Sequence, residues 1–243
     1  MRALFLEHDH MSPPGPLAER LSVRGFVVEE RVVVPAERYA SPNVTFSFPA
    51  IDDFDVVVVM GATWGAWDDD TIGAWLQPEL QWLADLHRAR VPILGICFGG
   101  QALARALGGS VSRAPRPEIG FTNVLTNEPE LVAPGPWFQF HYDRWTLPPR
   151  SVEIARSPLA SQAFVLDRTL GLQFHPEVTS AVLDTWMEDE NFVASGTRSA
   201  VAEDGQDLQV LRAQVAAEEP DAILRAYALL DAFLDRISGL RLP

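Results

Sequence analysis

Short apolar runs alternate with helical patterns along the first half of the chain. Four runs have the length of a strand, at residues 3–6, 26–34, 55–60 and 91–96. The run DVVVVM at 55–60 is β-branched and apolar on both faces, which is typical of a central parallel strand. Helical patterns lie at residues 17–23, 71–90 and 99–107, and Pro78 predicts a break or an N-terminal turn in the second of them. This order predicts an α/β fold with three layers around a mostly parallel sheet.

The pattern changes after residue 110. Six strand-like segments follow, at residues 118–126, 137–141, 145–147, 151–156, 163–166 and 170–174. We expect them to add antiparallel strands or a β meander to the same domain. Helical patterns return at residues 178–187, 208–217 and 221–238, and the small, polar residues 191–207 predict a loop. We therefore expect one domain over residues 1–190 and an acidic helical C-terminal extension over residues 191–243 that packs on it.

The composition of the chain excludes some classes of chemistry and argues against some classes of partner. The 243 residues include 33 acidic and 19 basic side chains, which gives a formal charge of −14. All basic residues are arginines, so chemistry that needs a lysine Schiff base or a P-loop lysine is excluded. The acidic balance argues against nucleic acid or an anionic membrane surface as the main partner. No apolar run approaches the ~20 residues of a membrane span and the start does not resemble a signal peptide, so we expect a cytoplasmic protein.

The single cysteine, Cys97, lies in the most informative segment. An apolar strand at residues 91–96 leads into Gly-x-Cys-x-Gly and then directly into a helical pattern. This is the strand–turn–helix context of a nucleophile elbow, in which flanking glycines let the turn tighten. The helix N-terminus favours a thiolate, and the Phe98 N–H can face a developing oxyanion. The alternative is a buried cysteine with a structural role only.

A nucleophilic cysteine needs a base, and His175 is the best placed of five histidines. It follows a strand-like run in the segment LQFHPEV, so it would reach the carboxyl edge of the sheet, where α/β sites form. Glu177, two residues later, can hold the other ring nitrogen and stabilise the imidazolium. The polar sequence His8-Asp9-His10 could bind a metal ion, but a polar loop at a strand end is the commoner explanation.

Taken together, the motifs resemble a known family. GICFGGQ at residues 95–101 and QFHPE at residues 173–177 resemble the signature of class I, or triad-type, glutamine amidotransferases. VVVMGATWGA at residues 57–66 resembles the glycine-rich loop after that family's third strand. FHYD at residues 140–143 and EIG at residues 118–120 resemble segments of the subgroup that contains the GMP-synthetase amidotransferase domain. The resemblance runs from residue 1 to about residue 185, and the chain is similar to stand-alone members.

The resemblance implies a flavodoxin-like fold, with the amidotransferase domain over residues 1–190. It implies that Cys97 attacks the γ-carbonyl of glutamine and that His175 and Glu177 complete a catalytic triad. The backbone N–H groups of Ala62 and Phe98 are the implied oxyanion hole. Four residues are implied at the substrate-binding pocket: Gly61, Gln101, Phe140 and His141. The sequence departs from the family pattern at Ala62 and Tyr142, where the family usually has glycine.

The implied reaction releases glutamate and ammonia through a thioester on Cys97, with no cofactor and no metal. Because the chain has no P-loop and no room for a second large catalytic domain, we expect a separate synthase subunit to take the ammonia. Two alternatives remain, a hydrolase of γ-glutamyl peptides or conjugates and an inactive regulatory domain on the same fold. An α/β-hydrolase is disfavoured because its acid precedes the histidine, whereas Glu177 follows His175. The sequence does not predict an oligomeric state.

Overall fold

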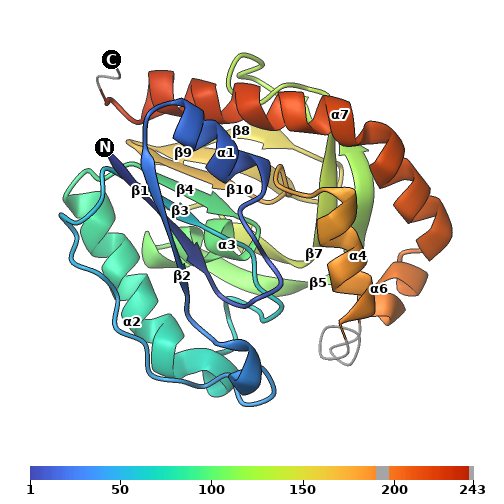
Figure 1. Cartoon of the computed structure of the whole chain (residues 1–243), viewed down its shortest axis with the longest axis horizontal. Helices are drawn as coiled ribbons and strands as arrows, with labels where there is room; N and C mark the ends of the chain where they lie inside the picture. Colours follow the sequence, from blue (N-terminus) through green and yellow to red (C-terminus); the bar gives the residue numbers. More distant parts are fainter. Residues whose placement is uncertain (190–196, 241–243) are drawn as a thin grey trace.

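The computed structural model describes residues 1–189 and 197–240. Its main feature is an eight-stranded sheet (Figure 1). From one edge to the other, the strands are β2 (Val27–Val32), β1 (Arg2–Glu7), β3 (Val56–Val59), β4 (Ile93–Ile96), β10 (Thr169–Leu172), β9 (Ser161–Leu166), β8 (Val152–Arg156) and β6 (Leu125–Thr126). The first five are parallel to one another, and the last three are antiparallel additions. This confirms the predicted α/β class with its mostly parallel sheet.

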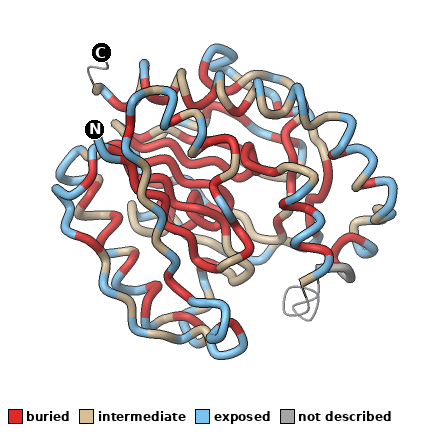
Figure 2. The backbone as a smooth tube through the Cα atoms, in the orientation of Figure 1, coloured by how far each residue is buried: buried red, intermediate tan, exposed pale blue. Residues whose placement is uncertain are grey.

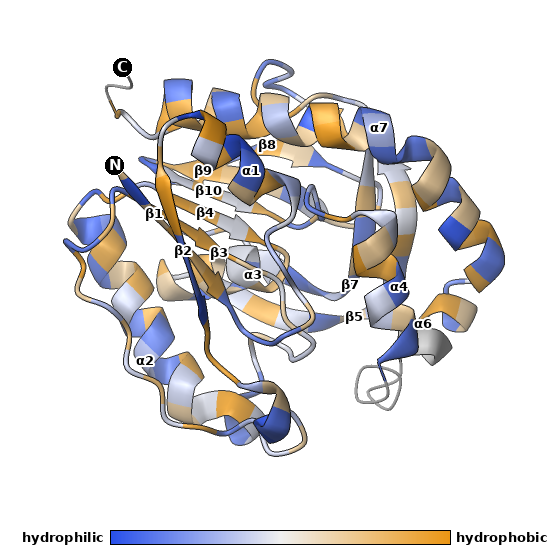
Figure 3. Cartoon of the chain, in the orientation of Figure 1, coloured by the Kyte–Doolittle hydropathy of each residue, from blue (hydrophilic) through white to orange (hydrophobic). Residues whose placement is uncertain are grey.

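Helices cover both faces of this sheet. On one face lie α1 (Pro16–Val23) and α7 (Leu208–Ala232), and on the other lie α2 (Asp69–Arg88) and α3 (Phe98–Ala106). Side chains alternate along β1, so that Ala3 and Phe5 pack toward α1 and α7 while Leu4 and Leu6 pack toward α2 and α3. The buried residues therefore concentrate on the central strands (Figure 2), which are also the most hydrophobic part of the chain (Figure 3).

A second, two-stranded sheet stands beside the first. It pairs β5 (Ser110–Asn123) with β7 (Pro136–Thr146) in antiparallel register. The helices α4 (Ser180–Glu188) and α6 (Thr197–Glu203) lie next to it (Figure 1), and their apolar residues form a third core cluster with Ile119 and Phe138. In residues 1–189 and 197–240, the remaining elements are a short 3₁₀ helix at Ala36–Arg38 and a π-helical turn at Phe233–Ile237. No helix among the described residues has the length and apolar content to cross a bilayer.

Several predicted boundaries were wrong for reasons of packing. Helix α2 continues through Pro78, because Trp75, Leu76, Trp82 and Leu83 bury its apolar side against the sheet. Their burial outweighs the roughly 3 kcal/mol that an internal proline costs. Helix α7 likewise continues through Pro220, where we predicted two helices.

Two further predictions need correction. The segments predicted at 137–141 and 145–147 belong to one strand, β7, which ends at Thr146, because the long partner β5 pairs with it along most of its length. Part of the predicted loop at 191–207 is the helix α6, whereas residues 190–196 lie outside the described residues. The domain boundary at residue 190 lies there too and stays a prediction. On the far side of that gap, α7 is tied to α1 by ion pairs of Arg20 and Arg24 with Asp231.

Candidate active site

Cys97 lies at a tight turn between β4 and α3. Its backbone has φ 48° and ψ −104°, a conformation that costs a non-glycine residue roughly 1–3 kcal/mol and that concentrates at functional sites. The turn packs tightly against the two neighbouring strands, β3 and β10. A Cβ on Gly99 would lie 2.1 Å from the Val59 carbonyl oxygen, and one on Gly100 would lie 2.5 Å from the Leu172 carbonyl oxygen. Only glycine fits these two positions, so the elbow geometry that the sequence motif predicts is present.

His175 follows β10, and its backbone N–H donates to the Phe138 carbonyl of β7 at 2.8 Å. Its ring nitrogen Nδ1 lies 2.7 Å from Oε1 of Glu177, and both side chains are buried. A carboxylate can only accept, so Nδ1 carries a proton and Nε2 is left to face other groups. The structure thus brings together the histidine and the acid that the sequence predicted as a pair.

The charge state of His175 follows from its surroundings. Burial alone would lower the pKa of the imidazole, but the charges of Glu177 and Cys97 outweigh burial and raise that pKa to about 10. At neutral pH the ring is therefore an imidazolium held between a carboxylate and the sulfur of Cys97. A protonated imidazole in this position can act as a general acid toward a group bound beside it.

The predicted oxyanion donors lie beside Cys97. Ala62 and Phe98 both line the pocket that Cys97 enters. Within the described residues, no acceptor takes a hydrogen bond from the backbone N–H of either residue. Gly61 lies against His175, since a Cβ at this position would be 3.3 Å from ring atom Cε1. Ala62, Phe98 and Cys97 therefore share one pocket, and His175 lies beside Gly61, the residue before Ala62.

The pocket has a volume of about 180 Å³. Of the residues predicted to bind substrate, Gln101, Phe140 and His141 line it, whereas Gly61 lies beneath it at the imidazole. The Gln101 side chain donates to the Asp143 carbonyl oxygen at 3.4 Å and to Oε1 of Gln173 at 3.3 Å. His141 is buried, and its Nε2 lies 3.3 Å from Oε2 of Glu118.

Sequence reasoning did not identify two charged residues of the pocket, Arg113 and Asp143. They are directly opposite each other in the β5–β7 register, yet no ion pair joins them in the described structure. Instead the Arg113 guanidinium lies over the Tyr142 ring at 4.2 Å, and Oδ2 of Asp143 accepts from the Trp67 indole at 2.9 Å. The other oxygen, Oδ1, is buried and accepts no hydrogen bond from any described residue. Only the strand register, which the sequence does not show, could have indicated this pair.

Tyr142 occupies a position where glycine was expected. Its hydroxyl donates to Oε2 of Glu203 on α6 at 2.5 Å. The same helix contributes Ala200 to the pocket wall. The C-terminal segment therefore takes part in the site, and the tyrosine connects the pocket to it.

The His8-Asp9-His10 segment is used in a different way from a metal site. His8 and Asp9 hold the loop at residues 61–63 through hydrogen bonds, and His10 faces Asp189. No group of three or more potential metal ligands occurs in the described part of the chain.

Comparison with known proteins shows the family of the chain. The model of the family "Glutamine amidotransferase class-I" matches residues 69–195, about half of the chain. The chain belongs to the class I glutamine amidotransferase family. That match includes Cys97, His175 and Glu177. The glycine loop at residues 61–65 and the whole of α7 lie outside the matched range.

Relatives in sequence are GMP synthases. The chain is 34% identical to the glutamine-hydrolyzing GMP synthase of Aeropyrum pernix over 140 residues, which cover 52% of this chain and 25% of that protein. It is 42% identical to one subunit of the glutamine-hydrolyzing GMP synthase of Sulfurisphaera tokodaii over 101 residues, which cover 37% of this chain and 53% of that relative. The chain thus spans from a quarter to about half the length of these relatives.

Solved structures share the fold over almost the whole chain. A glutamine amidotransferase from Thermotoga maritima superposes with a TM-score of 0.79 at 24% identity, covering 97% of this chain and 98% of that one. A glutamine amidotransferase from Methylobacillus flagellatus gives a TM-score of 0.82 at 23% identity, covering 100% and 96%. The matches extend through α7, so the C-terminal helices are part of a fold that these proteins share.

Proposed function

We propose that this chain hydrolyses the γ-amide of glutamine with Cys97 as the nucleophile. The observation that carries the proposal is the placement of Cys97, on a strained elbow, beside an imidazolium whose Nδ1 is held by buried Glu177 at 2.7 Å. A structural cysteine would need neither the left-handed backbone nor the buried histidine–acid pair. Membership of the family supports the same reaction.

The proposed reaction proceeds in two halves. The Cys97 thiolate attacks the γ-carbonyl carbon, and the N–H groups of Ala62 and Phe98 stabilise the oxyanion. His175 gives its Nε2 proton to the departing nitrogen, the C–N bond breaks, and ammonia leaves a γ-glutamyl thioester on Cys97. The neutral imidazole then removes a proton from water as the water attacks the thioester. Cleavage of the C–S bond releases glutamate and restores the thiolate and the imidazolium.

The charges of the pocket suit an amino-acid substrate. An α-amino acid carries one carboxylate and one ammonium group, and the pocket presents Arg113 and Asp143 without a mutual ion pair. We assign Arg113 to the α-carboxylate and Asp143 to the α-ammonium. Opposite charges at directly facing strand positions ordinarily pair with each other. Here Tyr142 and Trp67 hold the two groups separately, so neither has to break an ion pair to bind substrate.

The ammonia acceptor is proposed to be on another protein. The relatives in sequence are named as GMP synthases, and one of them is named as a subunit of that enzyme. Supply of ammonia to a synthase partner is therefore the most direct role for the reaction. The pocket residues themselves define only the γ-glutamyl half of the chemistry.

Release of glutamate by the purified chain tests the proposal. L-Glutamine and a panel of γ-glutamyl dipeptides are supplied in parallel, with Cys97→Ala as the control. We expect release from glutamine that the control abolishes while the circular dichroism spectrum is unchanged. Activity on dipeptides alone would replace the proposal with a γ-glutamyl peptide hydrolase. Activity that survives in Cys97→Ala would refute the mechanism.

A further inference from the structure

A fully buried histidine–glutamate pair lies directly behind the oxyanion loop. His8, just after β1, is 0% exposed, and so is Glu79 of α2. Nε2 of His8 lies 2.9 Å from Oε1 of Glu79, and Nδ1 lies 3.1 Å from the Gly61 carbonyl oxygen. Neither residue is used in the reaction described above, so the pair needs a separate explanation.

The hydrogen bond to Gly61 determines the orientation of one peptide group. The Gly61 carbonyl and the Ala62 N–H belong to the same peptide, and no peptide bond among the described residues is cis. In a trans peptide the C=O and N–H point in opposite directions. Because the carbonyl points at His8, the Ala62 N–H points away from it, on the side where Ala62 lines the Cys97 pocket.

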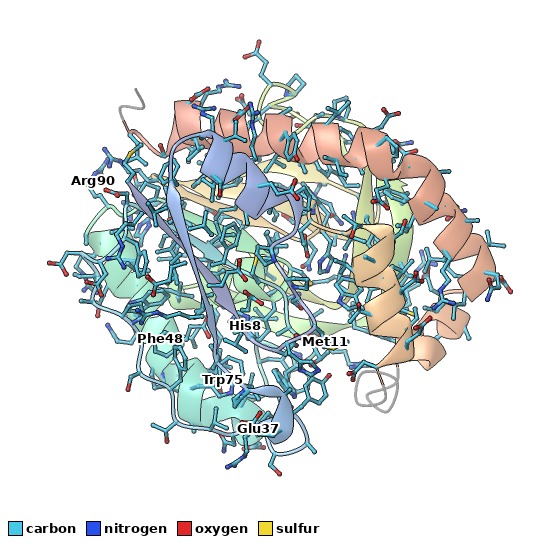
Figure 4. The ribbon with its side chains drawn as sticks, viewed as in Figure 1. His8, Met11, Glu37, Phe48, Trp75 and Arg90 are labelled. Carbon is cyan, nitrogen blue, oxygen red and sulfur yellow. The ribbon has the colours of Figure 1, made fainter. Side chains whose placement is uncertain are left out.

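The His8 ring is itself held firmly. It stacks on Trp75, with ring centroids 5.4 Å apart, and Figure 4 labels both residues. It also contacts the Phe98 ring, with centroids 4.5 Å apart. Phe98 carries the second candidate oxyanion N–H. Asp9 adds a second anchor, because its Oδ2 accepts from the Thr63 N–H at 3.3 Å. The two residues after β1 therefore fix the loop at residues 61–63 from behind.

The hydrogen-bond partners of His8 determine which of its ring nitrogens carries a proton. The Gly61 carbonyl can only accept, so Nδ1 must carry a proton. One further proton is shared between Nε2 and Glu79. Burial opposes a charge on His8, but the charge and hydrogen bond of Glu79 outweigh it and raise the pKa of the imidazole. A charged donor on the carbonyl polarises the peptide and strengthens its N–H as a donor on the other side.

A purely structural explanation accounts poorly for this pair. The pair lies beside the rings of Trp75 and Phe98 and the fully buried side chain of Asp9. A buried ion pair is often no more stabilising than apolar residues of the same volume. Glu79 also has a second oxygen, Oε2, that is buried without a hydrogen bond in the described structure. Such a costly arrangement fits a role in fixing geometry more than a role in stability.

We propose that His8, braced by Glu79, is a positioning residue that holds the Gly61–Ala62 peptide with its N–H toward the Cys97 pocket. The inference rests on the proposed function, because the N–H matters only when an oxyanion forms. His8 does not touch the substrate. It acts through the peptide, and its loss should lower kcat much more than it changes KM.

Two double variants separate positioning from packing. His8→Phe/Glu79→Met keeps an aromatic ring between Trp75 and Phe98 but removes the donor and the buried carboxylate. His8→Asn/Glu79→Gln keeps an N–H donor near the Nδ1 position. His87→Phe, a half-buried histidine on the same helix as Glu79, is the control. The measurements are kcat and KM for glutamine, the rate of Cys97 alkylation by iodoacetamide, and a crystal structure of each variant.

We expect His8→Phe/Glu79→Met to lose about 10²–10³-fold in kcat, the usual effect of losing one oxyanion donor. Alkylation forms no oxyanion, so its rate should stay within about twofold. The asparagine variant should recover most of kcat, and His87→Phe should match the unmodified chain. An unchanged kcat, a parallel loss of kcat and alkylation, or an unrotated peptide in the crystal structure would each overturn the inference.

Failure of the proposed function has a different signature. If the unmodified chain releases no glutamate from any γ-glutamyl substrate, the proposed function fails. The crystal structures then still decide whether His8 orients the Gly61–Ala62 peptide. If the unmodified chain is active and the variants do not differ from it, only the role of His8 fails.

Discussion

The close fit of Gly99 under the elbow predicts a large effect for a single methyl group. In Gly99→Ala the new Cβ would stand 2.1 Å from the Val59 carbonyl oxygen and 2.6 Å from the Val59 carbonyl carbon. Both atoms are backbone of the central strand β3, so no side chain can rotate away to make room. The Gly99 N–H also donates to the Met60 carbonyl at 3.1 Å, and any retreat of α3 would lengthen that bond.

The magnitude follows from comparable overpacked cores, in which extra methyl groups cost roughly 1–3 kcal/mol. We expect the upper part of this range, because the obstacle is backbone. For a domain of this length, 1 kcal/mol corresponds to roughly 2–4 °C in the melting temperature. At about 2–3 kcal/mol, Gly99→Ala should therefore melt about 4–12 °C lower. Because Cys97 lies two residues away on the same turn, glutamate release should fall as well.

Gly73→Ala provides the matched control. The same methyl group there meets its nearest neighbour, Cβ of Asp69, at 3.7 Å, which is an ordinary contact. Gly73 is inside helix α2, where alanine is favoured over glycine by about 1 kcal/mol, so this variant should be more stable than the unmodified chain. Urea unfolding followed by tryptophan fluorescence measures both. A free energy of unfolding for Gly99→Ala within about 0.5 kcal/mol of the unmodified chain would contradict the close packing of the elbow.

Three further predictions concern the charged groups. Glu177→Gln should lower kcat for glutamine by about 10³–10⁴-fold, since the ring would lose the carboxylate charge that stabilises its protonated form, and steady-state glutamate release measures it. An effect smaller than tenfold would contradict the role of this acid. Arg113→Gln should raise KM for glutamine but not for the amide of γ-aminobutyrate, which has no α-carboxylate, whereas Arg116→Gln on the same strand should change neither. Burial and a neighbouring carboxyl raise the pKa of Glu7 to about 8, so between pH 4.5 and 8 the folded chain holds a proton that the unfolded chain releases. The free energy of unfolding should therefore fall as pH rises through this window, by up to about 1.4 kcal/mol per pH unit. Glu7→Gln should flatten the dependence of the urea midpoint on pH between pH 5 and 6.5. This range lies below the one in which the raised pKa of His175 changes the stability.

The parallel half of the sheet could be predicted because local pattern and tertiary environment agree there. The run VVVV in β3 is apolar on both faces, and the structure buries it on both faces. The elbow was equally predictable, because an apolar strand, Gly-x-Cys-x-Gly and a helical pattern follow one another directly in the chain. The contacts that require Gly99 and Gly100, with Val59 and Leu172, are distant in sequence and appear only in the structure. The interruptions expected at Pro78 and Pro220 were wrong, because a proline's local cost was outweighed by burial against partners distant in sequence.

The candidate site, like the fold, could be predicted only in part from the sequence. Cys97, His175 and Glu177 could be named from two short motifs, but the sequence could not show that Nδ1 faces the acid at 2.7 Å. Arg113 and Asp143 have no motif of their own as a pair, because their relationship exists only in the register between β5 and β7.

By itself the sequence determined the class of fold, the nucleophile elbow and the order of the candidate triad, since each is encoded in contiguous residues with a strong local preference. Only the tertiary structure decided how these parts are supported. His8 and Glu79 are 71 residues apart in the chain, and Tyr142 and Glu203 are 61 apart, yet each pair is joined by a hydrogen bond. Contacts of this kind depend on which strands and helices become neighbours, and that is settled by burial of the whole apolar surface at once rather than by any local pattern.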